Sequence, residues 1–228
     1  MSKSNSWENG LLLLLFNNTD FANVGDAGGL QNSATAGSLY VSLHTADPGE
    51  AGSQTTSETA YTNYARVAVA RSGAGWTVTA NSVANAAAIA FAQCGVTGAT
   101  ITHWGLGTDA AGAGTLLYSN TLGASNQGPF TAKVDDTITI PGHTLVVNDR
   151  VAFYAAFGSS LPTGITEGTQ YFVITVSGDD ITISTTQGGG ALNITAVGDG
   201  VCYKASALAV SNGITPQFAI GALTITED

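Results

Sequence analysis

Short runs of alternating polar and apolar residues, separated by glycine-rich turns, constrain the fold of this chain more than any other feature. In Leu39–Thr45 and Trp76–Thr79 every second side chain is apolar, which is typical of a strand buried on one face. Asp47-Pro48-Gly49 follows the first run and favours a tight turn, because proline presets φ and glycine accepts positive φ. Strands this short at this spacing predict an all-β fold, an antiparallel β-sandwich of jelly-roll or immunoglobulin-like type.

Further runs of this kind continue to the end of the sequence. The other predicted strands of this part are Tyr64–Arg71, Ala86–Gln93, Thr100–Leu106 and Leu116–Ser119. At the end, Gly213–Asp228 alternates threonine with apolar residues and predicts a closing strand. Small and β-branched residues at this density favour short strands over long helices.

Ser6–Asn17 is the best candidate for a helix. Ser6 can cap its first turn, which also holds Glu8, and the apolar run Leu11–Phe16 follows. Because this run is apolar on all sides, we expect burial all round, in a short core or interface helix. The run is too short to cross a bilayer, and no basic stretch precedes it as in a signal peptide, so we expect synthesis in a reducing cytoplasm.

The charge balance excludes several classes of partner. Only 10% of the residues are charged, and six Lys and Arg against 16 Asp and Glu give a net charge of −10. With no basic cluster to neutralise phosphates, we expect no binding to nucleic acid and none to an anionic membrane. Low charge with many small residues is typical of shell, fibre and repeat proteins.

The pattern of predicted strands changes after Gly123. Longer strands are predicted at Thr137–Ile140, Arg150–Tyr154, Tyr171–Val176 and Asp180–Ser184, with a hairpin at Ser177–Asp180. We therefore predict an insert of residues 126–203, a small β-barrel or short sandwich, within a strand-to-strand loop of a framework domain of residues 1–125 and 204–228. The alternative is one continuous sandwich with extra strands.

Residues with possible redox or metal chemistry are few. Cys94 and Cys202 are expected to be buried free thiols, with one disulfide as the alternative. His44, His103 and His143 fit no zinc spacing and predict structural or surface roles, with a metal site at an oligomer axis as the alternative. The paired carboxylates Asp135-Asp136 and Asp179-Asp180 are expected in turns.

No catalytic motif is recognisable. The sequence has no Gly-x-Ser-x-Gly elbow before a helix and no P-loop, so we expect no enzyme activity and no cofactor. The aromatic residues expected in the core are Trp7, Trp76, Trp104, Phe91 and Phe218. Sugar binding would need exposed aromatic residues, which we expect only in the insert, at Phe153, Tyr154 or Phe157.

Several segments together resemble a known family. In order and spacing they are Trp7–Leu11, Leu39–Pro48, Tyr64–Val67, Thr102–Leu106 and Thr215–Thr226. They resemble a small β-protein family of tailed bacteriophages, whose members are virion surface proteins, either capsid cement (decoration) proteins or tail-fibre proteins. The insert separately resembles a module that occurs in many phage structural proteins. The segments that carry this resemblance are Pro141–His143, Asn148–Val151, Leu161–Gly164 and Gly168–Val173.

The resemblance implies a structural role in a virion assembled in the host cytoplasm. As a cement protein, the chain would self-associate as a dimer or trimer and bind the outer face of the major capsid protein shell. The loops 20–37 and 46–60 would contribute, and the expected contact residues are Leu11, Leu12, Leu13, Leu14, Leu15, Phe16, Asp47 and Pro48. The alternative is a tail-fibre or tail-tip component that contacts tail proteins, with the insert touching a host surface glycan.

Overall fold

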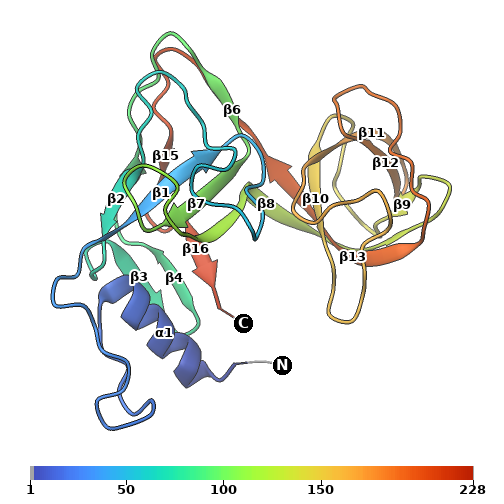
Figure 1. Cartoon of the computed structure of the whole chain (residues 1–228). Coiled ribbons are helices and arrows are strands. Elements are labelled where there is room, and N and C mark those ends of the chain that lie inside the picture. Colours follow the sequence, from blue (N-terminus) through green and yellow to red (C-terminus); the bar gives the residue numbers. More distant parts are fainter. Residues whose placement is uncertain (1–2, 228) are drawn as a thin grey trace.

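The chain folds into two lobes that are joined side by side (Figure 1). The structure, a computed structural model, describes residues 3–227. Antiparallel strands dominate, one short helix lies near the N-terminus, and the sheets pack in a sandwich-like arrangement. This confirms the predicted fold class. Each lobe is built around its own cluster of buried apolar residues, and the two clusters share no residue.

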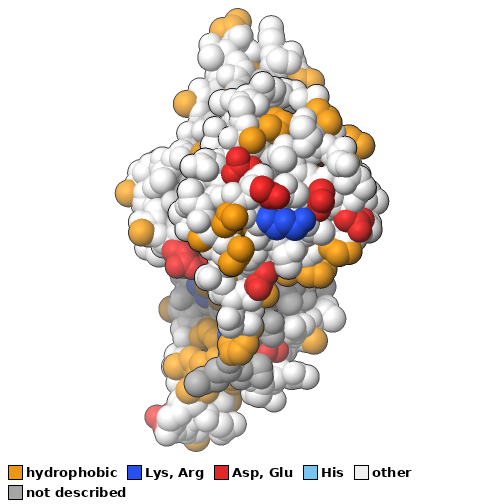
Figure 2. All heavy atoms as spheres, turned by 90° about the vertical axis from the view of Figure 1, so that its right-hand side faces the viewer, with side chains coloured by type: hydrophobic (Ala, Val, Ile, Leu, Met, Phe, Trp, Pro, Cys, Tyr) orange, Lys and Arg blue, Asp and Glu red, His pale blue; other side chains and the backbone are white. Residues whose placement is uncertain are grey.

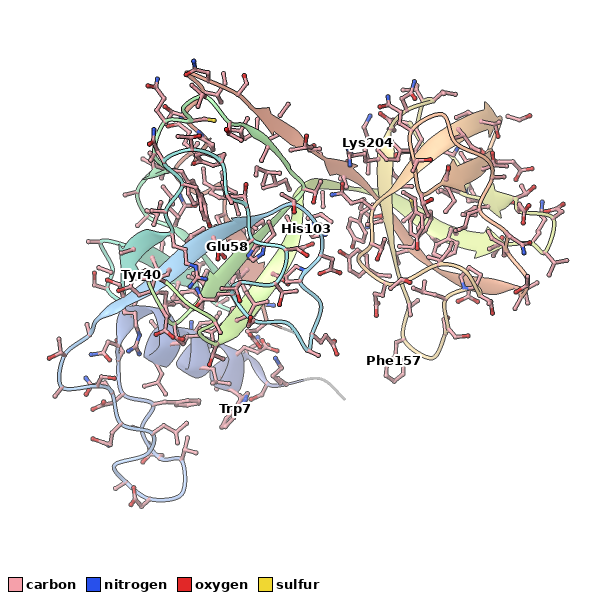
Figure 3. The ribbon with its side chains drawn as sticks, turned by 45° about the horizontal axis from the view of Figure 1, so that its top comes forward. Trp7, Tyr40, Glu58, His103, Phe157 and Lys204 are labelled. Atoms are coloured by element: carbon pink, nitrogen blue, oxygen red, sulfur yellow. The ribbon has the colours of Figure 1, made fainter. Side chains whose placement is uncertain are left out.

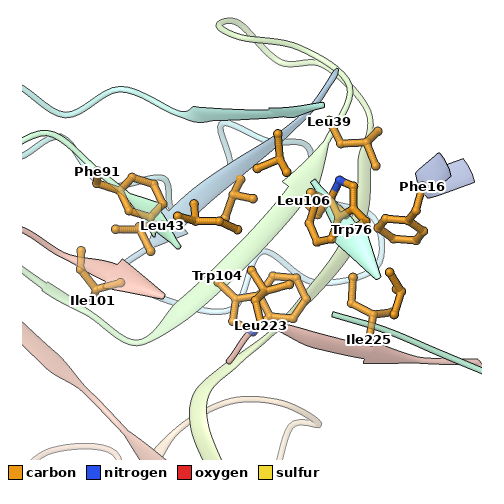
Figure 4. Packing of buried hydrophobic residues seen from close by; sticks show 14 of the residues in the cluster. Phe16, Leu39, Leu43, Trp76, Phe91, Ile101, Trp104, Leu106, Leu223 and Ile225 are labelled. Atoms are coloured by element: carbon orange, nitrogen blue, oxygen red, sulfur yellow. The ribbon is translucent and has the colours of Figure 1, made fainter. Parts of the chain in front are cut away.

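The larger lobe holds the helix and most of the short strands. Its elements are α1 (Asn5–Asn17), β1 (Ser38–His44), β2 (Val67–Ala70), β3 (Trp76–Thr79), β4 (Ser82–Asn85), β5 (Ile89–Ala90), β6 (Ala99–Ile101), β7 (His103–Gly107), β14 (Leu208–Val210), β15 (Gln217–Phe218) and β16 (Thr224–Thr226). β2, β1 and β7 are consecutive neighbours in one antiparallel sheet, and β3, β4 and β16 form another. Between them lies a core in which Trp76 packs edge-on against Phe16 of α1, at 5.0 Å between ring centroids (Figure 4).

Helix α1 differs in two ways from the prediction. Its N-cap is Ser4 rather than Ser6, since the Ser4 hydroxyl accepts a hydrogen bond from the Trp7 amide. Of the run Leu11–Phe16 only Leu12 and Phe16 are buried, because these two positions lie four residues apart on the face that covers β3 and β4. No helix among the described residues is long and apolar enough to span a membrane.

Two predicted strands of the larger lobe are shorter than expected. Only Val67–Ala70 of Tyr64–Arg71 is a strand, and only Ile89–Ala90 of Ala86–Gln93. Tyr64 and Arg66 instead direct their side chains to the Glu58 carboxylate.

The closing segment is two short strands rather than one. A turn in which the Ala222 amide bonds to the Ala219 carbonyl separates β15 from β16. The buried Asn85 side chain holds this turn, because its amide group donates to the Ala219 carbonyl at 2.8 Å and its oxygen accepts from the Leu223 amide at 2.9 Å. Gly221, with φ of +73°, completes the bend.

The smaller lobe is a closed barrel. Its elements are β9 (Ile138–Thr139), β10 (Arg150–Tyr154), β11 (Tyr171–Ser177), β12 (Asp180–Ser184) and parts of β8 (Leu116–Ala132) and β13 (Gly198–Ser206). The strand order is β13-β10-β11-β12-β9-β8, and an additional pairing of β13 with β8 closes the ring. β11 and β12 form the predicted hairpin around Gly178, whose φ is +62°. The inward side chains fill the barrel, as expected for one of this size.

The junction of the lobes is made of continuous strands. The predicted boundaries at 125/126 and 203/204 fall inside β8 and β13, so no strand-to-strand loop lies there. The two strands pair from Ser206–Leu122 in the larger lobe to Gly198–Ala132 in the barrel, with two register shifts on the way. The barrel is therefore attached through a two-stranded antiparallel ribbon. Independent folding of residues 126–203 stays a prediction.

Both cysteine thiols of the folded protein are expected to resist Ellman's reagent. Cys94 is buried in the core of the larger lobe and Cys202 in the barrel, and both are free. Burial also raises the pKa of the Cys202 thiol to about 12, which disfavours the reactive thiolate. In guanidinium without reductant, both thiols should react. No reaction in the unfolded protein would instead reveal a disulfide.

Candidate functional site at the junction of the two lobes

A cleft of about 480 Å³ lies where the two lobes meet. Its floor is the first part of β8, residues 116–120. The turn after β1 forms one wall and the barrel forms the other. The remaining lining residues are Asp47, Gly49, Glu50, His103, Tyr154, Glu167 and Gly168. Asp47, a predicted capsid contact, and Tyr154, a predicted contact of the insert, therefore line one cleft although they lie far apart in the sequence.

The two walls lie close together at Gly168. A Cβ at this position would clash with the Asp47 Oδ2 atom and would stand 3.8 Å from the Tyr154 hydroxyl. Gly168 also has a φ of +72°, which side chains rarely allow. The other oxygen of Asp47, Oδ1, accepts the Gly49 amide at 2.9 Å, which fixes the carboxylate in its turn. Glycine at position 168 therefore suits both the backbone conformation and the close approach of the two walls.

His103 of the larger lobe lines the cleft and contacts the barrel (Figure 3). Its side chain is buried, with Nε2 3.2 Å from the Gly168 carbonyl oxygen and Nδ1 2.9 Å from the Thr102 hydroxyl. A carbonyl oxygen only accepts, so Nε2 carries the proton and Nδ1 accepts from the hydroxyl. Beside it, the Gln170 amide donates to the Thr102 carbonyl at 3.0 Å. These bonds connect the barrel directly to the larger lobe.

Stability is expected to fall as the pH drops from about 6.5 to 5. Burial lowers the pKa of His103 below its ordinary value of 6.5, although the Gly168 carbonyl and the Asp47 carboxylate oppose the change. Burial likewise lowers the pKa of His44. At low pH the unfolded chain therefore binds protons that the folded chain does not bind. The contribution of these two histidines to the stability is complete above about pH 6.5 and is lost as the pH falls below it.

Thermal melts across this pH range provide the measurement. In His103→Gln the side-chain amide can still donate to Gly168 but does not titrate, so the melting temperature should depend less on pH than in the wild type. The pH dependence of the melting temperature that remains in this variant should come from His44. An identical pH profile in the two proteins would contradict the role given to His103.

A second hollow of about 380 Å³ adjoins the cleft on the other side of Tyr154. Asn120 and Tyr154 line both, and Ala124, Ala155, Val201 and Tyr203 complete the second. The Tyr154 and Tyr203 rings meet edge to face, with centroids 5.6 Å apart and an interplanar angle of 88°. Burial, followed by the Asp47 and Glu167 carboxylates, raises the pKa of Tyr154 to about 12, so its hydroxyl stays protonated at neutral pH. We call the cleft and the second hollow together the junction groove.

Several predicted contact residues are corrected by their burial. Phe153 is fully buried in the barrel core, because it points to the same face of β10 as Val151, so it cannot contact a ligand. Leu12, Phe16 and Pro48 are buried as well, and they are not available to a partner.

Other predicted contact residues remain accessible. Phe157 is 98% exposed on a barrel loop (Figure 3). Leu11, Leu13, Leu14 and Leu15 are half-buried on α1. Trp7, predicted in the core, is 38% exposed and packs against Phe21 instead, at 5.3 Å between ring centroids.

The sequence alone did not identify most of the junction groove. Four separate segments contribute Glu50, the adjacent Ser119 and Asn120, Glu167, and Tyr203, and only the fold brings them together. No Lys or Arg lines either hollow, so the groove offers carboxylate, amide and hydroxyl groups beside aromatic rings. Among residues 3–227, no group of three or more His, Cys, Asp and Glu side chains could hold a metal ion.

Comparison with known proteins gives one family. No curated protein matched the chain. A family model described as "Podophage GP4 fiber I protein gp80" matches residues 2–148, which include α1, β1 to β7, the ribbon strand β8 and the barrel strand β9. This agrees with the resemblance to phage virion proteins seen in the sequence. Since the match covers more than half of the chain, the protein belongs to the family of the podophage GP4 fiber I protein gp80, a family of phage fibre proteins.

Proposed function

We propose that the protein is a fibre component of a phage tail, in which the larger lobe attaches to other tail proteins and the barrel contacts the host cell surface. The observation that carries this proposal is the β8–β13 ribbon, which presents the barrel beside the larger lobe as a separate projecting unit (Figure 1). The family description, a fibre protein, favours this location over the capsid. We further propose that the protein acts by binding alone, without catalysis.

The outer end of the barrel suits a surface that faces solvent. Figure 2 shows hydrophobic side chains scattered among polar ones there, with a small basic group ringed by carboxylates. Such a mixed surface is typical of an accessible face rather than a buried subunit interface. Phe157, almost fully exposed, is the barrel residue that we propose to touch the cell.

A second candidate is capsid decoration, with the major capsid protein as partner. The half-buried leucines of α1 and the partly exposed Trp7 favour it, because together they leave apolar surface open on one side of the larger lobe. Decoration needs many copies that bind by repeated weak contacts, whereas a fibre needs few.

Protein stoichiometry in purified virions separates the two candidates. Quantitative mass spectrometry, normalised to the major capsid protein, should give few copies per particle for a fibre component. Immunogold labelling should then mark the tail. A copy number comparable to that of the major capsid protein, with label over the whole shell, would replace the fibre proposal by decoration. Purified protein should also compete with the phage for adsorption to host cells.

A further inference from the structure

We propose that the junction groove binds a saccharide that is uncharged or carries an amino group, and that it rejects acidic sugars. The inference deepens the proposed contact with the cell surface and rests on it for its biological setting. Its own support is the groove itself, which combines a volume suited to a small ligand, donors and acceptors suited to hydroxyl groups, and aromatic walls.

The size of the groove fits a short oligosaccharide. The two hollows measure about 480 and 380 Å³, each within the range of about 300–1,000 Å³ found for small-molecule sites. They adjoin at Asn120 and Tyr154, which line both. A ligand with two or more linked rings could therefore occupy both hollows and pass over Tyr154.

The groove offers hydrogen-bond acceptors in excess. Asp47, Glu50 and Glu167 bring three carboxylates to the cleft, and each ionised carboxylate can accept about four hydrogen bonds. The structure uses few of these: Asp47 Oδ1 accepts from Gly49, and Glu167 Oε1 accepts from the Ala155 amide at 3.1 Å. Sugar hydroxyls are donors that can use the remaining capacity.

The groove also offers donors, which a hydroxyl-bearing ligand needs for its own oxygens. The Asn120 oxygen accepts from the Thr121 amide at 2.7 Å and from the Tyr154 hydroxyl at 3.4 Å. The side-chain oxygen is therefore already bonded within the protein. The NH₂ group, with two donor hydrogens, is available to a ligand in the groove. Ser119 adds a hydroxyl. A Lys or Arg side chain of a protein partner would need acceptors only, so this mixed set favours a saccharide.

Aromatic walls suit the apolar faces of sugar rings. Tyr154 lies between the two hollows, and Tyr203 stands perpendicular to it in the second. The face of an aromatic ring carries partial negative charge and attracts the weakly positive C–H groups of a pyranose. Acidic sugars are disfavoured, since three carboxylates and no Lys or Arg line the groove, and like charges repel.

The test uses the full-length protein and an array of neutral, amino and uronic-acid oligosaccharides of equal length. The strongest neutral or amino binder is then titrated calorimetrically against Asn120→Ala and Glu50→Gln, both at exposed positions, and hydrogen exchange checks that each variant keeps both lobes folded. Each variant should bind about tenfold more weakly, which corresponds to about 1.4 kcal/mol. Val134→Ala is the matched control, an exposed barrel residue outside the groove lining, and it should bind as the wild type does.

Three results would overturn the inference: no oligosaccharide binds, the acidic sugars bind best, or the groove variants bind as tightly as the wild type. Binding of polylysine but of no sugar belongs to the first of these and would point to a basic protein partner. If the protein blocks phage adsorption yet binds no sugar, the groove inference fails and the cell-surface function stands. If sugar binds in the groove but adsorption is unaffected, the inference stands and the proposed function fails.

Discussion

Replacing Phe153 by alanine is expected to unfold the barrel while the larger lobe stays folded. The Phe153 side chain is fully buried, 4.9 Å from Phe130 and 6.2 Å from Tyr171 between ring centroids. Removing a buried phenylalanine costs about 3–5 kcal/mol, because transfer energy is lost and a cavity remains. That loss is a large share of the stability of a small domain. Hydrogen exchange followed by mass spectrometry should show lost protection in residues 126–203 alone.

The matched control is Phe157→Ala on the same lobe. Its side chain is 98% exposed, so the exchange pattern should stay that of the wild type. If Phe153→Ala instead removed protection from both lobes together, the framework domain and the insert would be one cooperative unit. The prediction of two domains would then give way to the alternative of one continuous sandwich.

Replacing Arg66 by alanine is expected to destabilise the larger lobe by about 3–5 kcal/mol, the effect of removing one partner of a buried ion pair. The Arg66 side chain is 2% exposed and the Glu58 side chain 15%. Two parallel bonds of 2.7 Å join the guanidinium to the two Glu58 oxygens, and two more reach the carbonyls of Asp109 and Gly112. The Glu58 carboxylate also accepts a hydrogen bond from the Tyr64 hydroxyl. Removing the Arg66 side chain would therefore weaken the contacts among three segments, which hold Glu58, Tyr64 with Arg66, and Asp109 with Gly112. Urea unfolding gives the free-energy difference.

Two variants separate geometry from charge. Arg66→Lys keeps the charge but cannot form the bidentate pair, so it should recover only part of the loss. Arg66→Ala combined with Glu58→Gln removes the uncompensated buried charge and should be less destabilised than Arg66→Ala alone. A change below about 1 kcal/mol in Arg66→Ala, the range of surface ion pairs, would contradict this assignment.

Alternation along the strands predicted much of the fold. The hairpin at Ser177–Asp180 and the bounds of β10 and β12 follow directly from the sequence. The length of β8 did not, because Gly123 and Gly128 interrupt its alternation and favour turns. In the structure both glycines have positive φ within the strand, where the ribbon bends between the lobes.

The candidate site was less predictable, for two physical reasons. The groove is lined by the turn at 47–50, the β8 segment and the barrel, so its composition depends on how the lobes are placed. The error at Phe153 has a simpler origin. Val151 and Phe153 share one face of a strand and Tyr154 the other, so alternation already separates the core residue from the groove residue.

The ribbon also determines how the molecule would carry mechanical load. The chain enters the barrel through β8 and leaves it through β13, side by side. A force that drags the barrel away from the larger lobe is shared by two covalent backbones and acts along the strands. On the larger lobe, the bonds of β8 to β7, from Leu116–Gly107 to Thr121–His103, are then sheared together rather than peeled one at a time. In a fibre tethered to a cell at its barrel, this ribbon would resist displacement of the barrel from the larger lobe more strongly than two flexible loops could.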